Sequence, residues 1–183
     1  TAAIPAVHAD RLRAGEAAGA AAVALIGNPI RPSEIITESS VENALRVLLA
    51  PGGSTNAIVH LIAVAGRLGI RIPLRKLNDL AETTPVLVSL KPVGGHYMED
   101  FFFSGGPGAV LRELRQLLDL DCRTVVSDTL GDRLETDPGP IDRRVIASAA
   151  DPFEPEGGLV ALFGSLAPRG AILKRSAADP SLF

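Results

Sequence analysis

The chain has 183 residues, of which 46% are hydrophobic and 21% are charged. This length favours one domain, or one domain with part of a second, and it is sufficient to bury a core. Eighteen basic residues against 21 acidic ones give a formal net charge of −3, which argues against a strongly basic nucleic-acid binder and provides no polybasic membrane patch. A single cysteine can form neither an internal disulfide nor, by itself, a zinc site or an iron–sulfur cluster.

No segment is expected to cross a membrane. The longest apolar run, residues 17–27, has about half of the roughly 20 residues that a spanning helix requires. The N-terminus lacks the basic start and apolar stretch of a signal peptide. The chain opens with Thr1 rather than Met, which fits a processed N-terminus and an ordinary sequence boundary equally well. The default expectation is a cytoplasmic protein.

The first half of the chain is predicted to be mainly helical. A Ser39–Glu42 capping box starts one of its helices. An apolar run at 85–90 has the length of a buried strand, and 97–103, with three consecutive phenylalanines, fits either a buried helix or a strand. The segments with the apolar spacing of helices are residues 9–26, 39–50, 54–68 and 74–82.

The second half is predicted to alternate short helices and strands. Residues 105–108 form a sharp glycine-rich break, and residues 137–140 have the composition of a linker or long turn. From residue 157 onward the pattern changes to strands. The expected helices are 109–118 and 127–134, and the expected strands are 123–126, 159–163 and 171–173. The sequence therefore predicts an α/β chain whose last part is a β region.

The most distinctive local motif is Gly-Gly-Ser-Thr-Asn at residues 52–56. A glycine pair lets the backbone approach a ligand closely, and the helix start that follows offers free N–H groups to a carboxylate or phosphate. Ser54, Thr55 and Asn56 add side-chain hydrogen bonds. The motif is not a Walker A loop, because no Gly-Lys-Ser/Thr follows. The alternative is a purely structural turn, in which glycines end one helix and hydroxyl residues begin the next.

Other polar residues give less specific signals. Lys91, in a Lys-Pro-x-Gly turn, is either an ammonium beside an anion or a surface loop residue. His60, on an apolar helix, is either a ligand or acid–base group or a core histidine. Glu99 and Asp100 are neighbours, so on a helix they face different ways and are more typical of a solvated face than of a catalytic pair. These patterns alone support an α/β domain with a candidate site for a small anion.

Five longer segments resemble the dihydroxy-acid/phosphogluconate/sugar-acid dehydratase family. They are GGSTNAIVHL from Gly52, LKPVGGHYMED from Leu90, GGPGAVLREL from Gly105, TVVSDTLG from Thr124 and GGLVALFGSLAPRGAILK from Gly157. Their order and spacing extend the resemblance along essentially the whole chain. Three further details resemble the aldonic sugar-acid branch, such as arabonate or xylonate dehydratases; these are residues 2–7, 99–102 and 176–180.

The resemblance implies a reaction, the loss of water from a 2,3-dihydroxy acid to give a 2-keto acid through an enol. In this family a Lewis-acidic iron of an iron–sulfur cluster takes the leaving 3-hydroxyl, Mg²⁺ is held near the substrate carboxylate, and a base removes the C2 proton. A metal is useful here because hydroxide is a poor leaving group whose charge the metal stabilises. The implied substrate is a small sugar acid, and the implied assembly is a homo-oligomer, either a dimer or a tetramer.

The resemblance also implies that this chain is a middle fragment. Residues 1–150 would be the back part of an N-terminal α/β domain, and residues 151–183 the first strands of a C-terminal β-barrel domain. The family's cluster cysteines, its Mg²⁺ carboxylates and its serine base fall outside the matched region, and Cys122 lies in no cluster motif. No catalytic residue or metal ligand is therefore expected here, and the isolated chain is expected to be inactive. The residues expected near the substrate or cluster are Ser54, Thr55, Asn56 and Lys91.

The chain departs from the family pattern in several loops. Gly105–Gly108 replaces a usual Gly-Gly-x-Pro, Gly164–Pro168 replaces Gly-Asn-Leu-Ala-Pro, and Ala147–Ser148 replaces an Arg-Pro pair. Two alternatives to a sugar-acid dehydratase remain. One is dihydroxy-acid dehydratase of branched-chain amino-acid biosynthesis. The other is a non-catalytic remnant or interaction fragment with exposed strand edges and apolar patches.

Overall fold

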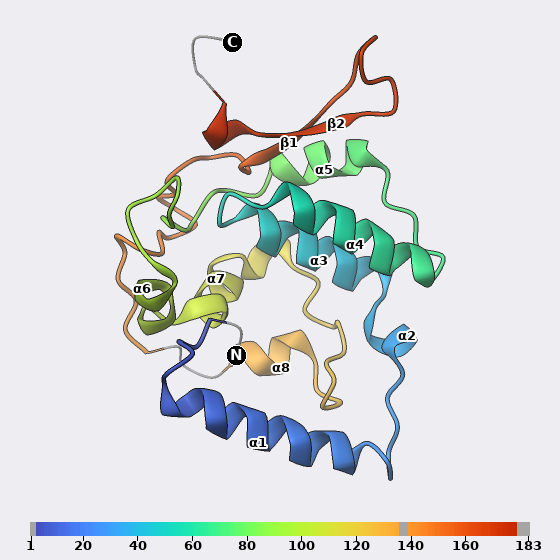
Figure 1. Ribbon diagram of the computed structural model, residues 1–183, viewed down its shortest axis with the longest axis vertical. Coiled ribbons are helices and arrows are strands. Elements are labelled where there is room, and N and C mark those ends of the chain that lie inside the picture. The colour runs from blue at the N-terminus through green and yellow to red at the C-terminus, as the bar shows by residue number, and fades with distance from the viewer. Residues whose placement is uncertain (1–2, 136–138, 179–183) are drawn as a thin grey trace.

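The structure, a computed structural model, describes residues 3–135 and 139–178. Within these residues the chain is α/β, with eight α-helices and one two-stranded antiparallel sheet (Figure 1). The hairpin lies at one end of the molecule beside α5, and α1 lies at the opposite end. In chain order the elements are α1 (Ala9–Ala24), α2 (Pro32–Ile35), α3 (Glu38–Leu49), α4 (Thr55–Arg67), α5 (Leu74–Ala81), α6 (Met98–Phe103), α7 (Gly106–Glu113), the 3-10 helix η1 (Arg115–Leu117), α8 (Leu130–Leu134), β1 (Leu159–Leu162), β2 (Ala171–Lys174) and the 3-10 helix η2 (Arg175–Ala177).

Helices α3, α4 and α5 pack together with strand β1 around one buried apolar cluster. Each helix has its apolar residues three or four positions apart, which puts them on one face. Leu49 and Leu159 are fully buried in this cluster, so the late strand β1 covers a helix from the first third of the chain. The buried members are Val41, Leu45, Leu49, Ile58, Ala65, Leu77, Leu80, Ala81, Leu159 and Ala161.

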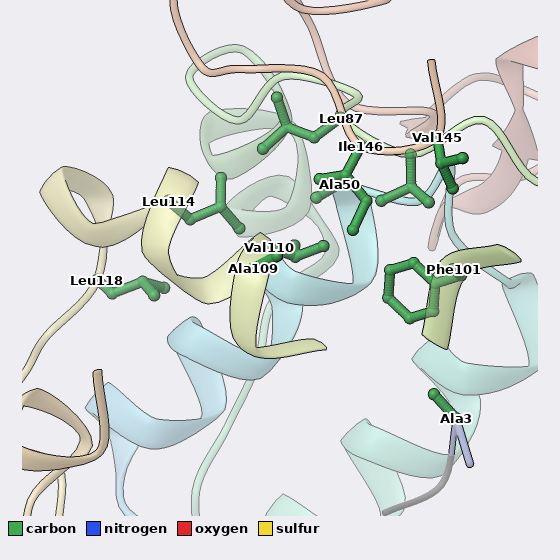
Figure 2. Packing of buried hydrophobic residues seen from close by; sticks show 11 residues of the cluster. Ala3, Ala50, Leu87, Phe101, Ala109, Val110, Leu114, Leu118, Val145 and Ile146 are labelled. Carbon is green, nitrogen blue, oxygen red and sulfur yellow. The ribbon is translucent and has the colours of Figure 1, made fainter. Parts of the chain in front are cut away.

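A second buried cluster lies between α6, α7 and two extended segments (Figure 2). Val110 and Leu114, four residues apart at the end of α7, face Leu87 and Ile146, which come from loops 59 residues apart in sequence. Phe101 of α6 closes one side of this cluster. Val145 and Ile146, which follow the predicted linker or long turn at 137–140, therefore pack into the same core as the helices that precede it.

The hairpin is held to the helices by a side-chain amide. Within the sheet, Leu159 of β1 pairs with Lys174 of β2. On the other edge of β1, Asn78 of α5 donates from Nδ2 to the Ala161 carbonyl (3.0 Å) and accepts at Oδ1 from the Ala161 N–H (2.7 Å). These two bonds satisfy backbone groups that a neighbouring strand would otherwise satisfy.

The segment at 85–90 is not the regular strand that its apolar pattern predicts. Its backbone makes isolated bridges to Glu154, Ile146 and His96. The N–H groups of both Leu87 and Val88 donate to one carbonyl at the end of α3, at N–O distances of 2.7 and 3.2 Å. Because its hydrogen bonds go to several separate loops, the segment is extended and buried without forming a ladder.

Several predicted boundaries are also wrong. Helix α3 begins one residue before the predicted range, and its N-cap lies two residues earlier than predicted, because Thr37 rather than Ser39 is the cap and Ser40 completes the capping box. The helix expected over 109–118 spans 106–113 and then tightens into η1. Residues 123–126 are not a strand but a turn with one bridge between Arg123 and Thr129, and the helix expected from 127 begins after the Thr129 cap. The helices at 54–68 and 74–82, and both hairpin strands, are confirmed to within about one residue.

Helix α1 has no buried residue. Its larger apolar side chains lie in solvent, with Leu12 79% and Val23 68% exposed. The predicted helix is thus present, but its apolar residues contact nothing in the described part of the chain that buries them. Over residues 3–135 and 139–178, no helix has both the length and the apolar character needed to span a bilayer.

Candidate functional site

The turn between α3 and α4 forms one wall of a cavity of about 780 Å³. The volume is within the usual range for small-molecule sites. Three other segments complete the walls, namely residues 86–94, residues 153–158 and the end of β2 with the start of η2. Leu48, Val88 and Leu90 are among the apolar lining residues, and charged side chains come from Lys91, Glu154, Glu156, Lys174 and Arg175.

The four candidate residues from the sequence occupy different positions relative to this cavity. Ser54 and Lys91 line it. Thr55 and Asn56 form the exposed first turn of α4, next to the lining residues. Ser54 has the extended backbone of an N-cap (φ −135°, ψ 128°), but its side chain makes no capping hydrogen bond. In an ordinary N-cap the side-chain oxygen accepts a hydrogen bond from a backbone N–H of the first helical turn, and the Ser54 hydroxyl does not.

The glycine pair of the motif is required by the fold itself. Gly52 and Gly53 have φ values of +79° and +70°, a region that side-chain-bearing residues rarely adopt. A Cβ on Gly53 would lie 2.5 Å from Cδ1 of Leu159. The space that Gly53 leaves open is therefore occupied by Leu159 of the chain's own strand β1.

Gly158, in a second glycine pair, packs against Gly52 of the first. A Cβ on Gly158 would lie 2.6 Å from Gly52 Cα and 2.7 Å from its carbonyl oxygen, and both are backbone atoms. In the sequence, Gly157 and Gly158 stand where the pattern changes to strands. The structure shows that Gly158 lets the start of β1 lie against Gly52 of the α3–α4 turn, while Gly157 lies against Leu49 and Ala81, and both glycines line the cavity.

Two cationic side chains in the cavity wall already have partners. Lys91 donates from Nζ to the Tyr97 hydroxyl (2.6 Å), and its ammonium lies 4.0 Å from the centre of that ring. Arg175 forms an ion pair with Glu156. Their charges are therefore directed toward other residues of the chain.

Lys174 is one of the cavity residues that the sequence analysis does not single out. It is the last residue of β2, and its Nζ donates to the Gly53 carbonyl oxygen at 3.1 Å across 121 residues of sequence. The available signal was its position at the end of the Gly-Ala-Ile-Leu-Lys run from Gly170, which begins at a glycine turn and reads as a strand ending in a cation.

The other polar candidates lie elsewhere. His60 is exposed on α4, so it is not a core histidine. Glu99 and Asp100 are both exposed, as a solvated face requires, and Asp100 has a local structural role because its Oδ2 accepts from the Tyr97 N–H (2.8 Å) at the start of α6. His96 Nδ1 is 3.9 Å from Asp100 Oδ2.

The donor groups in the described residues do not fit an iron–sulfur cluster or a Mg²⁺ ion. Residues 3–135 and 139–178 contain no group of three or more His, Cys, Asp or Glu side chains arranged to hold a metal. Cys122 is partly buried, and burial together with Asp119 and Asp121 raises the pKa of its thiol. Asn43 Nδ2 lies 3.4 Å from the Cys122 sulfur. A thiol with a raised pKa is a poor metal ligand, because the thiolate is the binding form.

Known proteins match the chain along almost its whole length. The family model described as "Dihydroxy-acid/6-phosphogluconate dehydratase N-terminal" matches residues 1–133, and the corresponding C-terminal model matches residues 144–183. A protein named dihydroxy-acid dehydratase from Caldicellulosiruptor saccharolyticus is 44% identical over 98% of this chain and 33% of its own length. One of the same name from Caldanaerobacter subterraneus subsp. tengcongensis is 41% identical over 98% of this chain and 32% of its own. The chain thus spans about a third of these relatives, and it belongs to the dihydroxy-acid/6-phosphogluconate dehydratase family.

Proposed function

We propose that the chain is part of a hydro-lyase that converts a 2,3-dihydroxy acid into a 2-keto acid by removing water. The observation that carries the proposal is the match of both family regions, in order, along one chain. The cavity is consistent with it, because Gly53 and Ser54 come from the first matched region and Gly158 and Lys174 from the second. A cavity between two parts of a protein is a common place for a small-molecule site.

Within this proposal the described residues form part of the substrate environment. Ser54 is the strongest of the sequence candidates, because its uncapped hydroxyl belongs to a cavity-lining residue and can hydrogen-bond a substrate hydroxyl. Lys91 is a weaker candidate, since it is engaged by Tyr97. Thr55 and Asn56 are candidates at the cavity edge. The iron–sulfur cluster and Mg²⁺ belong to the proposal for the complete protein, with ligands outside the described residues of this chain.

Two substrate classes compete. The relatives named above carry the name dihydroxy-acid dehydratase, which favours a branched aliphatic dihydroxy acid. The details at residues 2–7, 99–102 and 176–180 favour a sugar acid. The deciding experiment compares 2-keto acid formation by the complete protein from 2,3-dihydroxy-isovalerate and from arabonate or xylonate. Equal failure on all of these acids would remove the hydro-lyase proposal.

We also propose that the chain is covered by further protein, in a homo-oligomer, when it is active. It exposes 11130 Å², whereas a compact monomer of its 19.0 kDa mass is expected to expose about 8,400 Å². The excess is comparable to a large protein interface, which the rest of the complete protein, another subunit, or both would cover. The alternative of a non-catalytic remnant predicts that no larger assembly has hydro-lyase activity, which sedimentation combined with the same 2-keto acid assay would test.

The two-part division, with a boundary near residue 150 and the start of a β-barrel after it, is likewise a proposal. The interval between the two matched regions, residues 134–143, supports a change of region slightly earlier in the chain. Limited proteolysis would test it, because cleavage should concentrate in this interval. Val145 and Ile146, which follow it, are buried in the core with Leu87 and so should be protected.

A further inference from the structure

The ammonium of Lys174 is held by a hydrogen bond to the Gly53 carbonyl and forms no ion pair with a described residue. One of its three N–H donors is used by the Gly53 carbonyl at 3.1 Å, which holds the end of β2 to the α3–α4 turn. Both Lys174 and Gly53 line the cavity, and the bond that joins the ammonium to the Gly53 carbonyl is partly buried. Two donors are left for another group.

The charge of Lys174 is not neutralised by the described part of the chain. Of the other cavity cations, Arg175 is paired with Glu156, and Lys91 contacts Tyr97. No carboxylate of residues 3–135 or 139–178 lies within ion-pair distance of Lys174. Three cationic side chains and two carboxylates line the cavity, so the lining carries one positive charge in excess. A partly buried charge is stabilised by a counter-ion.

The rest of the lining indicates what kind of anion fits. Apolar side chains form much of the wall, namely Leu48, Val86, Val88, Leu90, Val93 and Phe153. An acid with an aliphatic chain can place its alkyl part against this wall and its carboxylate on the ammonium, as in other mixed apolar and polar ligand sites. A polyhydroxylated acid would leave hydroxyls facing apolar side chains, which is unfavourable.

We propose that Lys174 binds the carboxylate of a small aliphatic hydroxy acid in this cavity, while its bond to Gly53 sets the position of the ammonium. This inference rests on the proposed function, since it identifies a substrate contact for the same cavity. It assigns to Lys174 a binding role in addition to its structural one. A lysine with only the structural role would leave ligand affinity insensitive to the charge.

The test uses the 183-residue chain and 2,3-dihydroxy-isovalerate, followed by amide chemical shifts of Gly53 and Ser54. The acid should shift both signals to saturation, and the uncharged amide of the same acid should not. Lys174→Gln should weaken binding by about tenfold or more, because a charge-assisted contact is lost. Lys174→Arg should retain most of the affinity. Lys76→Gln is the matched control, since Lys76 is paired with Glu42 outside this cavity, and it should leave the affinity unchanged.

Several outcomes would overturn the proposal. They are the absence of shifts at Gly53 and Ser54, equal affinity of the Lys174→Gln chain, and equal binding of arabonate or inorganic phosphate. If Lys174→Gln does not fold, the affinity of the unmodified chain at low and high ionic strength decides, because a contact to an ammonium weakens with salt. These readouts measure binding to this chain, so their failure is distinct from a failure of 2-keto acid formation by the complete protein.

Discussion

Replacing Gly158 with alanine tests the close contact between the α3–α4 turn and the start of β1. The new Cβ would lie 2.6 Å from Gly52 Cα, 2.7 Å from its oxygen and 2.9 Å from its carbonyl carbon. Carbon atoms prefer separations of about 3.5–4.0 Å, so the two backbones must move apart by about 1 Å. That movement also displaces the buried Leu159 and Ala161. Overpacking of this kind costs about 1–3 kcal/mol, and we expect the upper end because neither side is a flexible side chain.

The expected result is a melting temperature lowered by roughly 6–12 °C, since 1 kcal/mol corresponds to about 2–4 °C for a chain of this size. Thermal unfolding followed by circular dichroism measures it. Gly66→Ala is the control, because a Cβ there meets nothing within 4 Å and alanine should stabilise the end of α4 slightly. A Gly158→Ala chain that melts within about 1 °C of the unmodified chain would refute the packing argument.

Three further predictions follow from local contacts. Ser127 has a φ of +73°, so Ser127→Gly should raise the free energy of unfolding by about 0.5–1 kcal/mol; a lower urea midpoint would contradict this. Burial raises the pKa of the Cys122 thiol above its ordinary value of 9.0. The pH at which iodoacetamide begins to alkylate this thiol rapidly should therefore be higher for the folded chain than for the urea-unfolded chain. Hydrogen bonds from the side chain and backbone of Arg144 lower the pKa of Asp142 from 3.8 to about 2. Its contribution to stability is therefore present above pH 3.8 and lost as the pH falls toward 2, and Asp142→Asn should remove this part of the acid dependence measured by unfolding.

The elements that the sequence predicts well are those determined by local patterns. The amphipathic helices α4 and α5 and the two hairpin strands have clear apolar spacing and glycine or proline boundaries. The segment at 85–90 fails for a non-local reason. Its apolar side chains are buried as expected, but its backbone hydrogen bonds go to residue 50 and to residues 145 and 154, which no local pattern reveals.

The same distinction applies to the candidate site. Ser54 and Lys91 stand in recognisable loop motifs, and both line the cavity. Gly158 and Lys174 complete the site through contacts with Gly52 and Gly53, more than a hundred residues earlier in the chain. Helix α1 shows the converse. Its alanine-rich sequence predicts the helix correctly but does not reveal that no described residue buries its apolar side chains.

Strand β1 lies near the end of the chain, and this position affects the order of folding. The cluster shared by α3, α4 and α5 is completed by Leu159 and Ala161, so closing it requires a chain loop of about a hundred residues. Contacts of such long range slow folding, and a chain emerging from the ribosome presents its N-terminal helices first. Until residues 157–161 have been synthesised, Leu49 and Leu80 lack the strand that covers them. We therefore expect these apolar side chains to be exposed in the interval between the synthesis of α5 and of β1, when exposed apolar surface favours aggregation.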